Sequence, residues 1–325
     1  MFDKRLWISL GITLLIDTGL RVWAEYRLPW LASVLLYLVM YAIVSALFST
    51  RETETDKPAM PVLPTSGPIG RYGQPGLVFA FTVSGLLSLF NPFQLWQMLL
   101  QAIGNVRLAS EQQKAPITAD YINRARYRLP FDGEWYVYNG GVDPDTSHSW
   151  DVLTQRYAYD FVMVDASMAR HQGRGVDLHD YYCYGQPILA AADGEVVRVA
   201  DGIRDAPFVG YGVADFLARS FVGNYVVIQH ADDEYGFYAH LVQGSIAVSV
   251  GEKVAQGQLI GRCGHSGHSS EPHLHFHLQN RPNFFFALGL PIQFETLSVD
   301  DHIVDRAVIK AGQKVSHTAH HLGVP

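Results

Sequence analysis

Three histidines alternate with apolar residues in the segment EPHLHFHL, residues 271–278. Successive side chains of a β-strand point to opposite faces, so His273, His275 and His277 share one face and the leucines and phenylalanine between them share the other. Neighbouring members of this row stand roughly 6 to 7 Å apart along the strand. Two of them can therefore reach one bound ion or substrate in different roles, one as a ligand and one as a catalytic base.

Two other predicted strands also end in residues that can do chemistry. Asp160 ends the segment QRYAYD, and His240 ends YGFYAH. Two histidines and one carboxylate can hold a catalytic zinc ion and leave a fourth position for water. Zinc lowers the pKa of that water and polarises a carbonyl, and an imidazole outside the ligand set can move the proton.

Composition excludes some function classes. The 325 residues are 48% hydrophobic, the net charge is -7, and no run of lysine and arginine provides a surface for nucleic acid. The only cysteines, Cys183 and Cys263, form no CxxC motif, so a metal must be held by histidine, aspartate or glutamate. They can form one disulfide in an exported domain, or remain two small buried thiols.

The first 106 residues are predicted to be a transmembrane region that binds the lipid bilayer. Residues 29–48 are uncharged and long enough to cross it. Residues 6–24 are apolar but contain Asp17 and Arg21, which can pair on one helix face. A first span is expected here, and a signal peptide ending near Ala24 is the alternative.

A flexible loop over residues 49–75 precedes a third apolar stretch, 77–103, interrupted by Asn91-Pro92. It is predicted as a third span with a proline kink, and a short span followed by an interfacial helix is the alternative. Lysine and arginine before the first run and in the loop place both on the cytoplasmic side. Three crossings would put the rest of the chain outside.

The remainder is predicted as a connector (107–126), an all-β domain of antiparallel strands (127–297) and a C-terminal extension (298–325). The domain shows nine short alternating runs separated by glycines. The extension contains His317, His320 and His321 and is predicted to be a solvated tail; an accessory metal site is the alternative.

Six motifs in this order resemble the lysostaphin/LytM-type zinc metallopeptidases, which cut peptide cross-links of bacterial cell walls. They are YAYDF (157–161), PILAAADGEVV (187–197), GNYVVIQH (223–230), YAHL (238–241), VAQGQLIGRCGHSG (254–267) and EPHLHF (271–276). The resemblance implies an all-β catalytic domain in which Asp160 and His275 bind Zn²⁺. It also implies that His240 and His273 act as general base and transition-state stabilisers.

One position departs from the family pattern. The first zinc ligand is usually a histidine four residues before the aspartate, where this chain has Arg156. His148 is predicted to replace it, with His171 and His179 as the alternatives. His277 is expected beside the site or exposed rather than on the metal, and His265 and His268 lie in the loop leading to it.

The resemblance predicts a membrane-anchored zinc metalloendopeptidase that hydrolyses peptide cross-links of peptidoglycan. It would be a multi-pass protein of the bacterial inner (cytoplasmic) membrane, with its catalytic domain facing the periplasm or cell exterior. The alternative is a catalytically impaired domain that regulates or binds cell-wall hydrolases, supported by Arg156. A regulatory membrane or cell-wall protein is a further expected partner.

Overall fold

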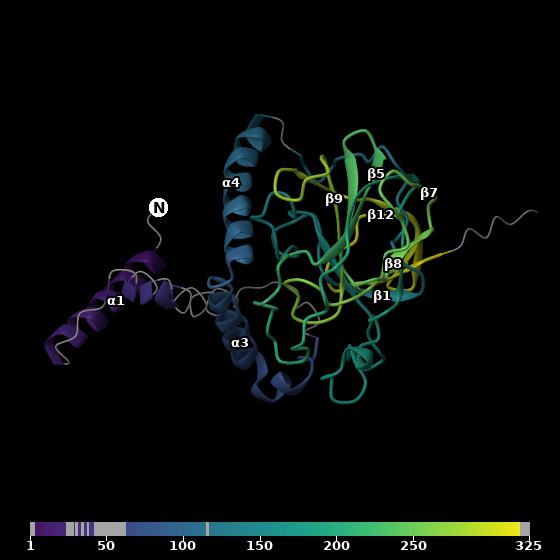
Figure 1. The fold of residues 1–325 in the computed structure, drawn as a ribbon. Coiled ribbons are helices and arrows are strands. Elements are labelled where there is room, and N and C mark those ends of the chain that lie inside the picture. Colours follow the sequence, from purple (N-terminus) through teal and green to yellow (C-terminus); the bar gives the residue numbers. More distant parts are fainter. Residues whose placement is uncertain are drawn as a thin grey trace, which may run out of the picture. The chain divides into compact units, whose positions relative to one another are not determined.

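The computed structural model describes residues 4–23, 29, 32–33, 36–37, 39–41, 63–114 and 117–318 (Figure 1). The chain divides into two compact units, Met1–Ala59 and Met60–Pro325. In the first unit helix α1 spans Lys4–Trp23, and Arg21 pairs with Asp17 one turn earlier at 2.6 Å, as their spacing predicts. Most of the predicted span 29–48 lies outside the described residues, and its crossing stays a prediction.

The predicted third span is two helices. Helix α3 (Gly73–Ser88) and helix α4 (Pro92–Lys114) meet at a bend of 96°; among the described residues only this bent pair, and no single helix, has the length and apolar content of a membrane span. Asn91 starts the second helix, because its side-chain oxygen accepts hydrogen bonds from the amides of Phe93 and Gln94. Pro92 fits the first helical position, where no N–H is needed. The predicted connector from residue 107 therefore begins as the last turns of α4.

Both ends of α3 are attached to the β domain. Before it, a 3₁₀ helix η1 (Pro68–Tyr72) is held by the amide of Ile69, which donates to the carbonyl of Gly210 at 3.2 Å. After it, the Gln94 side chain donates to the carbonyl of Asp215 at 2.7 Å. The two ends of α3 are therefore both held to the β domain, and the third crossing stays a prediction.

The β domain is built on one large antiparallel sheet with the strand order β12-β11-β13-β1-β2-β9-β6-β5-β4-β7, and β10 pairs with β9. A small second sheet pairs β3 with β8. The strands are β1 (Glu134–Asn139), β2 (Tyr159–Val162), β3 (Pro187–Leu189), β4 (Gly194–Ala200), β5 (Asn224–Ala231), β6 (Glu234–Leu241), β7 (Lys253–Val254), β8 (Leu259–Arg262), β9 (Leu274–Gln279), β10 (Gly289–Leu290), β11 (Phe294–Val299), β12 (His302–Ala307) and β13 (Lys314–His317). All nine predicted strands are present, and the predicted all-β domain is confirmed.

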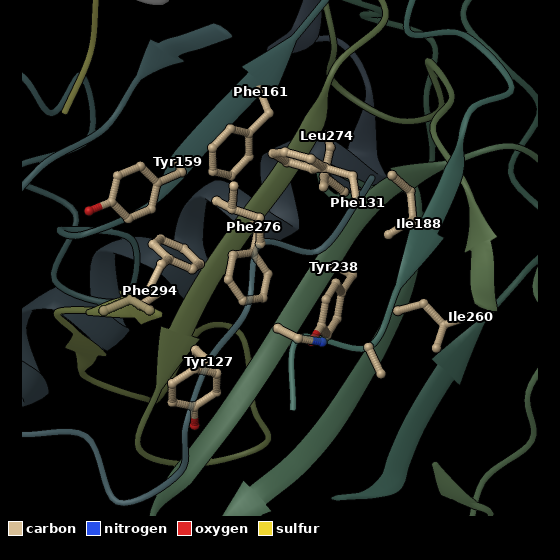
Figure 2. Packing of buried hydrophobic residues seen from close by; sticks show 14 of the residues in the cluster. Tyr127, Phe131, Tyr159, Phe161, Ile188, Tyr238, Ile260, Leu274, Phe276 and Phe294 are labelled. Atoms are coloured by element: carbon tan, nitrogen blue, oxygen red, sulfur yellow. The ribbon is translucent and has the colours of Figure 1, made fainter. Parts of the chain in front are cut away.

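The main core lies on one face of the large sheet. Leu274, Phe276 and Leu278 of β9 are fully buried there, which confirms the predicted alternation of that strand. Tyr238 of β6 packs against Phe276, with ring centroids 4.7 Å apart (Figure 2). The opposite face of the same strands is consequently available to the polar side chains.

The predicted solvated tail is wrong as far as His317. Strand β13 pairs with β1, so that Val315 lies opposite Trp135, and both side chains are buried. Leu297 and Ile309 of the same region are also fully buried in the main core. The C-terminal segment contains few apolar residues, but they are buried at the end of the core. Their burial stabilises the C-terminal strands in the sheet. His320 and His321 lie outside the described residues.

Candidate active site

Three adjacent strands bring the predicted residues together. In the ladder, Asp160 of β2 pairs with His275 of β9, and His275 pairs with Ala239 of β6, one residue before His240. Asp160, His275 and His240 are 6%, 4% and 7% exposed. These side chains lie on the sheet face opposite the main core, because their strand neighbours Tyr159 and Phe276 point into that core.

The Asp160 carboxylate is the centre of the cluster. Its Oδ1 lies 2.9 Å from Nδ1 of His275 and 3.6 Å from Nε2 of His273, and its Oδ2 lies 3.6 Å from Nε2 of His148. Burial acts to raise the pKa of Asp160, but the nearby charge of His148 and His273 and the contact with His275 outweigh it and hold the pKa well below its usual range. The carboxylate is therefore ionised at neutral pH.

His148 reaches this cluster through a loop that folds back on itself. The hydroxyl of Ser147 donates to the carbonyl of Arg156 at 2.8 Å, and that of Ser149 donates to the carbonyl of Gln155 at 2.7 Å. The two serines flank His148 and so hold it beside the chain that enters β2. The Arg156 side chain turns to the ring of Trp150, with its guanidinium carbon 4.9 Å from the ring centroid. His148 thus lies beside the Asp160 carboxylate, whereas the Arg156 side chain lies against Trp150.

The alternative ligands have other contacts. His171 accepts a hydrogen bond from the amide of Gly67 at Nε2, and its Nδ1 faces the carbonyl of Gln172. The ring of His179 packs edge-on against Tyr184. Of the three candidates, His148 is the one that the structure places beside Asp160.

A chain of hydrogen bonds fixes the tautomer of His275. Gln279 must direct its amide nitrogen to the carbonyl of Arg281, which only accepts, so its side-chain oxygen faces Nε2 of His277 at 2.9 Å. His277 then donates from Nε2 and accepts at Nδ1, 3.0 Å from Nε2 of His275. His275 must donate from Nε2. Burial, together with the nearby charge of His275, lowers the pKa of His277 to about 3, so this ring is neutral.

In this hydrogen-bonded arrangement, the lone pair of His275 Nδ1 is directed at the ionised Asp160. Two acceptors 2.9 Å apart need either a proton or a metal ion between them. A second proton on His275 is disfavoured, because burial lowers the pKa of that imidazole. Histidine nitrogen and carboxylate oxygen are donors that zinc accepts. The chemistry of this pair therefore fits a metal ion.

The distances fit less completely. Donor atoms in a tetrahedral zinc shell are about 3.3 Å apart. The distance from the Asp160 carboxylate is shorter than this for Nδ1 of His275, at 2.9 Å, and longer for Nε2 of His148, at 3.6 Å. In the described part of the chain, no group of three or more histidine, cysteine, aspartate or glutamate side chains is arranged so that it could hold a metal ion. The His148 side chain is 44% exposed, which leaves it room to move.

His240 and His273 are both oriented by backbone carbonyls. Nδ1 of His240 donates to the carbonyl of Ser266 at 2.7 Å, and Nδ1 of His273 donates to that of Glu271 at 2.8 Å. In a neutral imidazole this leaves Nε2 as the proton acceptor. Burial, then the charges of His273 and His275, lowers the pKa of His240 well below its usual value. The two rings lie 4.7 Å apart, and each is suited to accept a proton.

Two features of this site gave no signal in the sequence. His240 has a positive φ of 60°, a conformation uncommon for a residue with a side chain, at the end of β6. Asn139 of β1 donates to Oδ2 of Asp160 at 3.0 Å and so orients the carboxylate. An asparagine twenty-one residues upstream is recognised as a partner only once β1 and β2 are paired.

The loop histidines have structural contacts. His265 is fully buried, with Nδ1 2.9 Å from the hydroxyl of Ser269. His268 lies between the rings of Phe81 and Phe221. His277, expected beside the site, is completely buried there and stacks on Phe237.

The site lies in a cleft of about 710 Å³. Its lining includes His148, Asp160, His240, His273 and His275. It also includes residues of α3 and α4, among them Leu77, Phe81 and Met98. The helical region before the β domain therefore forms part of the active-site cleft.

Cys183 and Cys263 are free and buried in the structure. Burial, then a hydrogen bond between the two thiols, raises the pKa of Cys263. Of the two alternatives left open by the sequence, a disulfide or two buried thiols, the structure shows the two buried thiols.

Comparison with known proteins finds a sequence similarity to one peptidase family. Residues 171–285 match the sequence model described as Peptidase family M23. The chain thus contains a Peptidase family M23 match within its β domain, which is called the M23 domain below. The matched part of the M23 domain includes His240, His273 and His275, whereas Asp160 and His148 precede it.

Curated relatives share part of this chain. Peptidoglycan DD-endopeptidase ShyA of Vibrio cholerae is 31% identical over 175 residues, which are 53% of this chain and 32% of ShyA. ShyB of the same organism is 34% identical over 53% of this chain and 32% of its own length. Murein hydrolase activator NlpD of Salmonella dublin is 31% identical over 41% of this chain and 30% of NlpD. The chain thus spans about a third of the length of each.

Solved structures with similarity to the M23 domain include a zinc-containing peptidase from Vibrio cholerae, with 26% identity and a TM-score of 0.32 over 52% of this chain and 41% of that one. The catalytic domain of lysostaphin from Staphylococcus simulans has 21% identity and a TM-score of 0.28 over 53% of this chain and 94% of that one.

Proposed function

We propose that this protein is a membrane-anchored zinc metalloendopeptidase that hydrolyses peptide cross-links of bacterial peptidoglycan. The observation that supports the proposal is the 2.9 Å contact between Nδ1 of His275 and Oδ1 of the ionised Asp160, two atoms that a zinc ion could bridge. His148, Asp160 and His275 would hold zinc. When bound, zinc would supply an activated water and polarise the scissile carbonyl.

The remaining catalytic roles are proposed for His240 and His273. His240, neutral and with Nε2 free to accept, would take the proton of the attacking water. His273, oriented by the carbonyl of Glu271, would in its protonated form donate from Nε2 to the developing oxyanion, and His240 would return to the leaving amine the proton that it took from water. The peptidoglycan substrate is inferred from the DD-endopeptidases among the relatives.

The location is proposed from the substrate. Peptidoglycan lies outside the cytoplasmic membrane, so the M23 domain would face the periplasm or cell exterior, with the chain anchored by the apolar runs 6–24 and 29–48. Two crossings before the domain would place the N-terminus on the same side as the domain, whereas three crossings would leave the N-terminus in the cytoplasm, as Lys4 and Arg5 favour. Alkaline phosphatase fused after residue 318 should be active in cells, and an inactive fusion would contradict this location.

The test uses the full chain purified in detergent. It should contain about one zinc ion per chain and release cross-linked muropeptide products from isolated sacculi. Asp160→Ala should lose both zinc and hydrolysis, whereas His240→Ala should keep zinc and lose hydrolysis. Sacculi that remain intact with zinc-loaded protein would exclude the peptidase.

A regulator of cell-wall hydrolases is the second candidate. It is favoured by the similarity to a murein hydrolase activator and by Arg156 at the usual position of a ligand. A regulator would act in cells without hydrolysis of its own. Full function in cells of both Asp160→Ala and His240→Ala would therefore decide for this candidate.

A further inference from the structure

The segment 73–106, called the elbow below, comprises α3, the turn after it and α4 as far as Val106. It contains no Asp, Glu, Lys or Arg, and Arg71 and Arg107 stand at its two ends. An uncharged segment of this length that is bounded by arginines is typical of chain in contact with lipid. The 96° bend, however, prevents it from being one straight span.

The elbow exposes its apolar side chains. Phe79 is 70% exposed, Phe90 is 75%, Trp96 is 58% and Val106 is 76%. A helix on the surface of a water-soluble domain normally turns such residues toward the core. Contiguous exposed apolar surface of this kind marks an interaction site.

The buried side of the elbow is polar. Ser84, Ser88 and Gln94 are at most 1% exposed. Gln94 donates to the carbonyls of Asp215 and Ala218, at 2.7 and 3.1 Å. One turn on, the Gln97 side chain donates to the carbonyl of Arg219 and accepts from the amide of Phe221, both at 2.9 Å. These amides fix α4 to a loop of the M23 domain and leave the apolar side outward.

We propose that the exposed side of the elbow lies in the boundary between the headgroups and acyl chains of a lipid membrane. Lipid needs apolar surface without specific polar partners, whereas a protein interface has a polar rim with hydrogen bonds. The aromatic side chains of Trp96 and Phe93 suit that depth, and the Arg219 guanidinium carbon lies 5.6 Å from the ring centroid of Phe93, as expected of a cation that reaches the headgroups. The uncharged run 29–48 earlier in the chain brings the elbow to a membrane.

This placement has a consequence for the cleft, which rests on the proposed function. Leu77, Val78 and Phe81 of α3 line the cleft, and the ring of Phe81 lies 6.3 Å from that of His268. The elbow would therefore hold one wall of the cleft at the lipid surface. The substrates within reach are wall peptides held next to the membrane.

The experiment places spin labels on the full chain reconstituted into vesicles of phosphatidylethanolamine and phosphatidylglycerol. Phe90→Cys and Val106→Cys report on the elbow, and Val250→Cys and Ile303→Cys are matched controls at exposed apolar positions of the β domain. The native cysteines are buried. Collision of each nitroxide with oxygen, which dissolves in lipid, is compared with collision with a water-soluble nickel chelate.

The elbow labels should collide mainly with oxygen and the control labels mainly with nickel. Nickel access at Phe90→Cys and Val106→Cys equal to that of the controls would overturn the proposal. Exclusion of both reagents from the elbow would also overturn it, because it would show a protein partner or a second copy there. The labels report position without catalysis, so an inactive protein with lipid-exposed labels would refute the peptidase and leave the membrane contact standing.

A second measurement tests the consequence for substrate. The double variant Phe79→Ser and Phe90→Ser should keep its zinc content and its rate on soluble muropeptides. It should release less product from wall fragments attached to membrane vesicles. Equal rates of variant and wild type on both substrates would remove the link between the elbow and substrate choice.

Discussion

Replacement of His277 by phenylalanine tests whether the hydrogen-bond chain prepares His275 for a metal. Phenylalanine keeps a flat ring to stack on Phe237, whose centroid is 5.1 Å away, but removes both nitrogens. His275 then has no acceptor at Nε2. It can adopt the other tautomer and donate from Nδ1 to Asp160 at 2.9 Å. A metal would have to displace that proton, so its affinity should fall.

The size of the effect follows from the role of the hydrogen bond between His277 and His275. Removal of a partner that orients a metal-ligating histidine lowers affinity by about 10- to 100-fold, or about 1.4 to 2.7 kcal/mol. The variant should also be less stable, because the side-chain oxygen of Gln279, in a fully buried residue, is left without its donor, at a cost of about 1 to 3 kcal/mol. Gln279→Met, which keeps the His277 ring, should give a smaller fall in zinc affinity.

The assay is competition for zinc against a fluorescent chelator, with thermal unfolding of the metal-free protein measured in parallel. His230→Phe is the matched control, because His230 also has partners at both nitrogens, the carbonyl of Asp193 and the hydroxyl of Tyr238. It should be less stable without a change in zinc affinity. If His277→Phe bound zinc as tightly as the wild type while His275→Ala did not, the assigned tautomer would be wrong.

Three further predictions concern the rest of the domain. His148→Ala should lower zinc affinity more than His277→Phe does in the same competition assay, and unchanged affinity would exclude His148 as a ligand. Burial lowers the pKa of His230 to about 4, below the unfolded value of about 6.5. As the pH is lowered, the unfolded chain therefore takes up this proton before the folded one does. The free energy of unfolding, measured with urea, should decrease as the pH drops from about 6.5 to about 4, and it should decrease less steeply in His230→Phe than in the wild type. Oxidation should join the two thiols that are in contact, and peptide mapping without reductant that finds both free would refute this.

The sequence was sufficient for the parts of the site that lie on strands. Alternation along β9 predicts which side chains share a face, and glycines mark the ends of neighbouring strands, so the nine strands and the positions of Asp160, His240 and His275 were predictable. The C-terminal strands were not, because their burial depends on pairing with β1, far away in the sequence. The bend before α4 was open to prediction, since Asn91-Pro92 is a helix start as well as a kink.

The loop that carries His148 explains why the sequence alone left this histidine open as a ligand. A metal site requires donor atoms at certain points in space, and the register of β2 and β9 supplies two of them. The proposed third donor, His148, lies in a loop that the Ser147 and Ser149 hydroxyls hold to carbonyls just before β2. Those bonds place His148 beside Oδ2 of Asp160, whereas the Arg156 side chain donates to the carbonyl of Trp150. A histidine eight residues earlier can therefore take the same place, because the serine contacts shorten the distance in space.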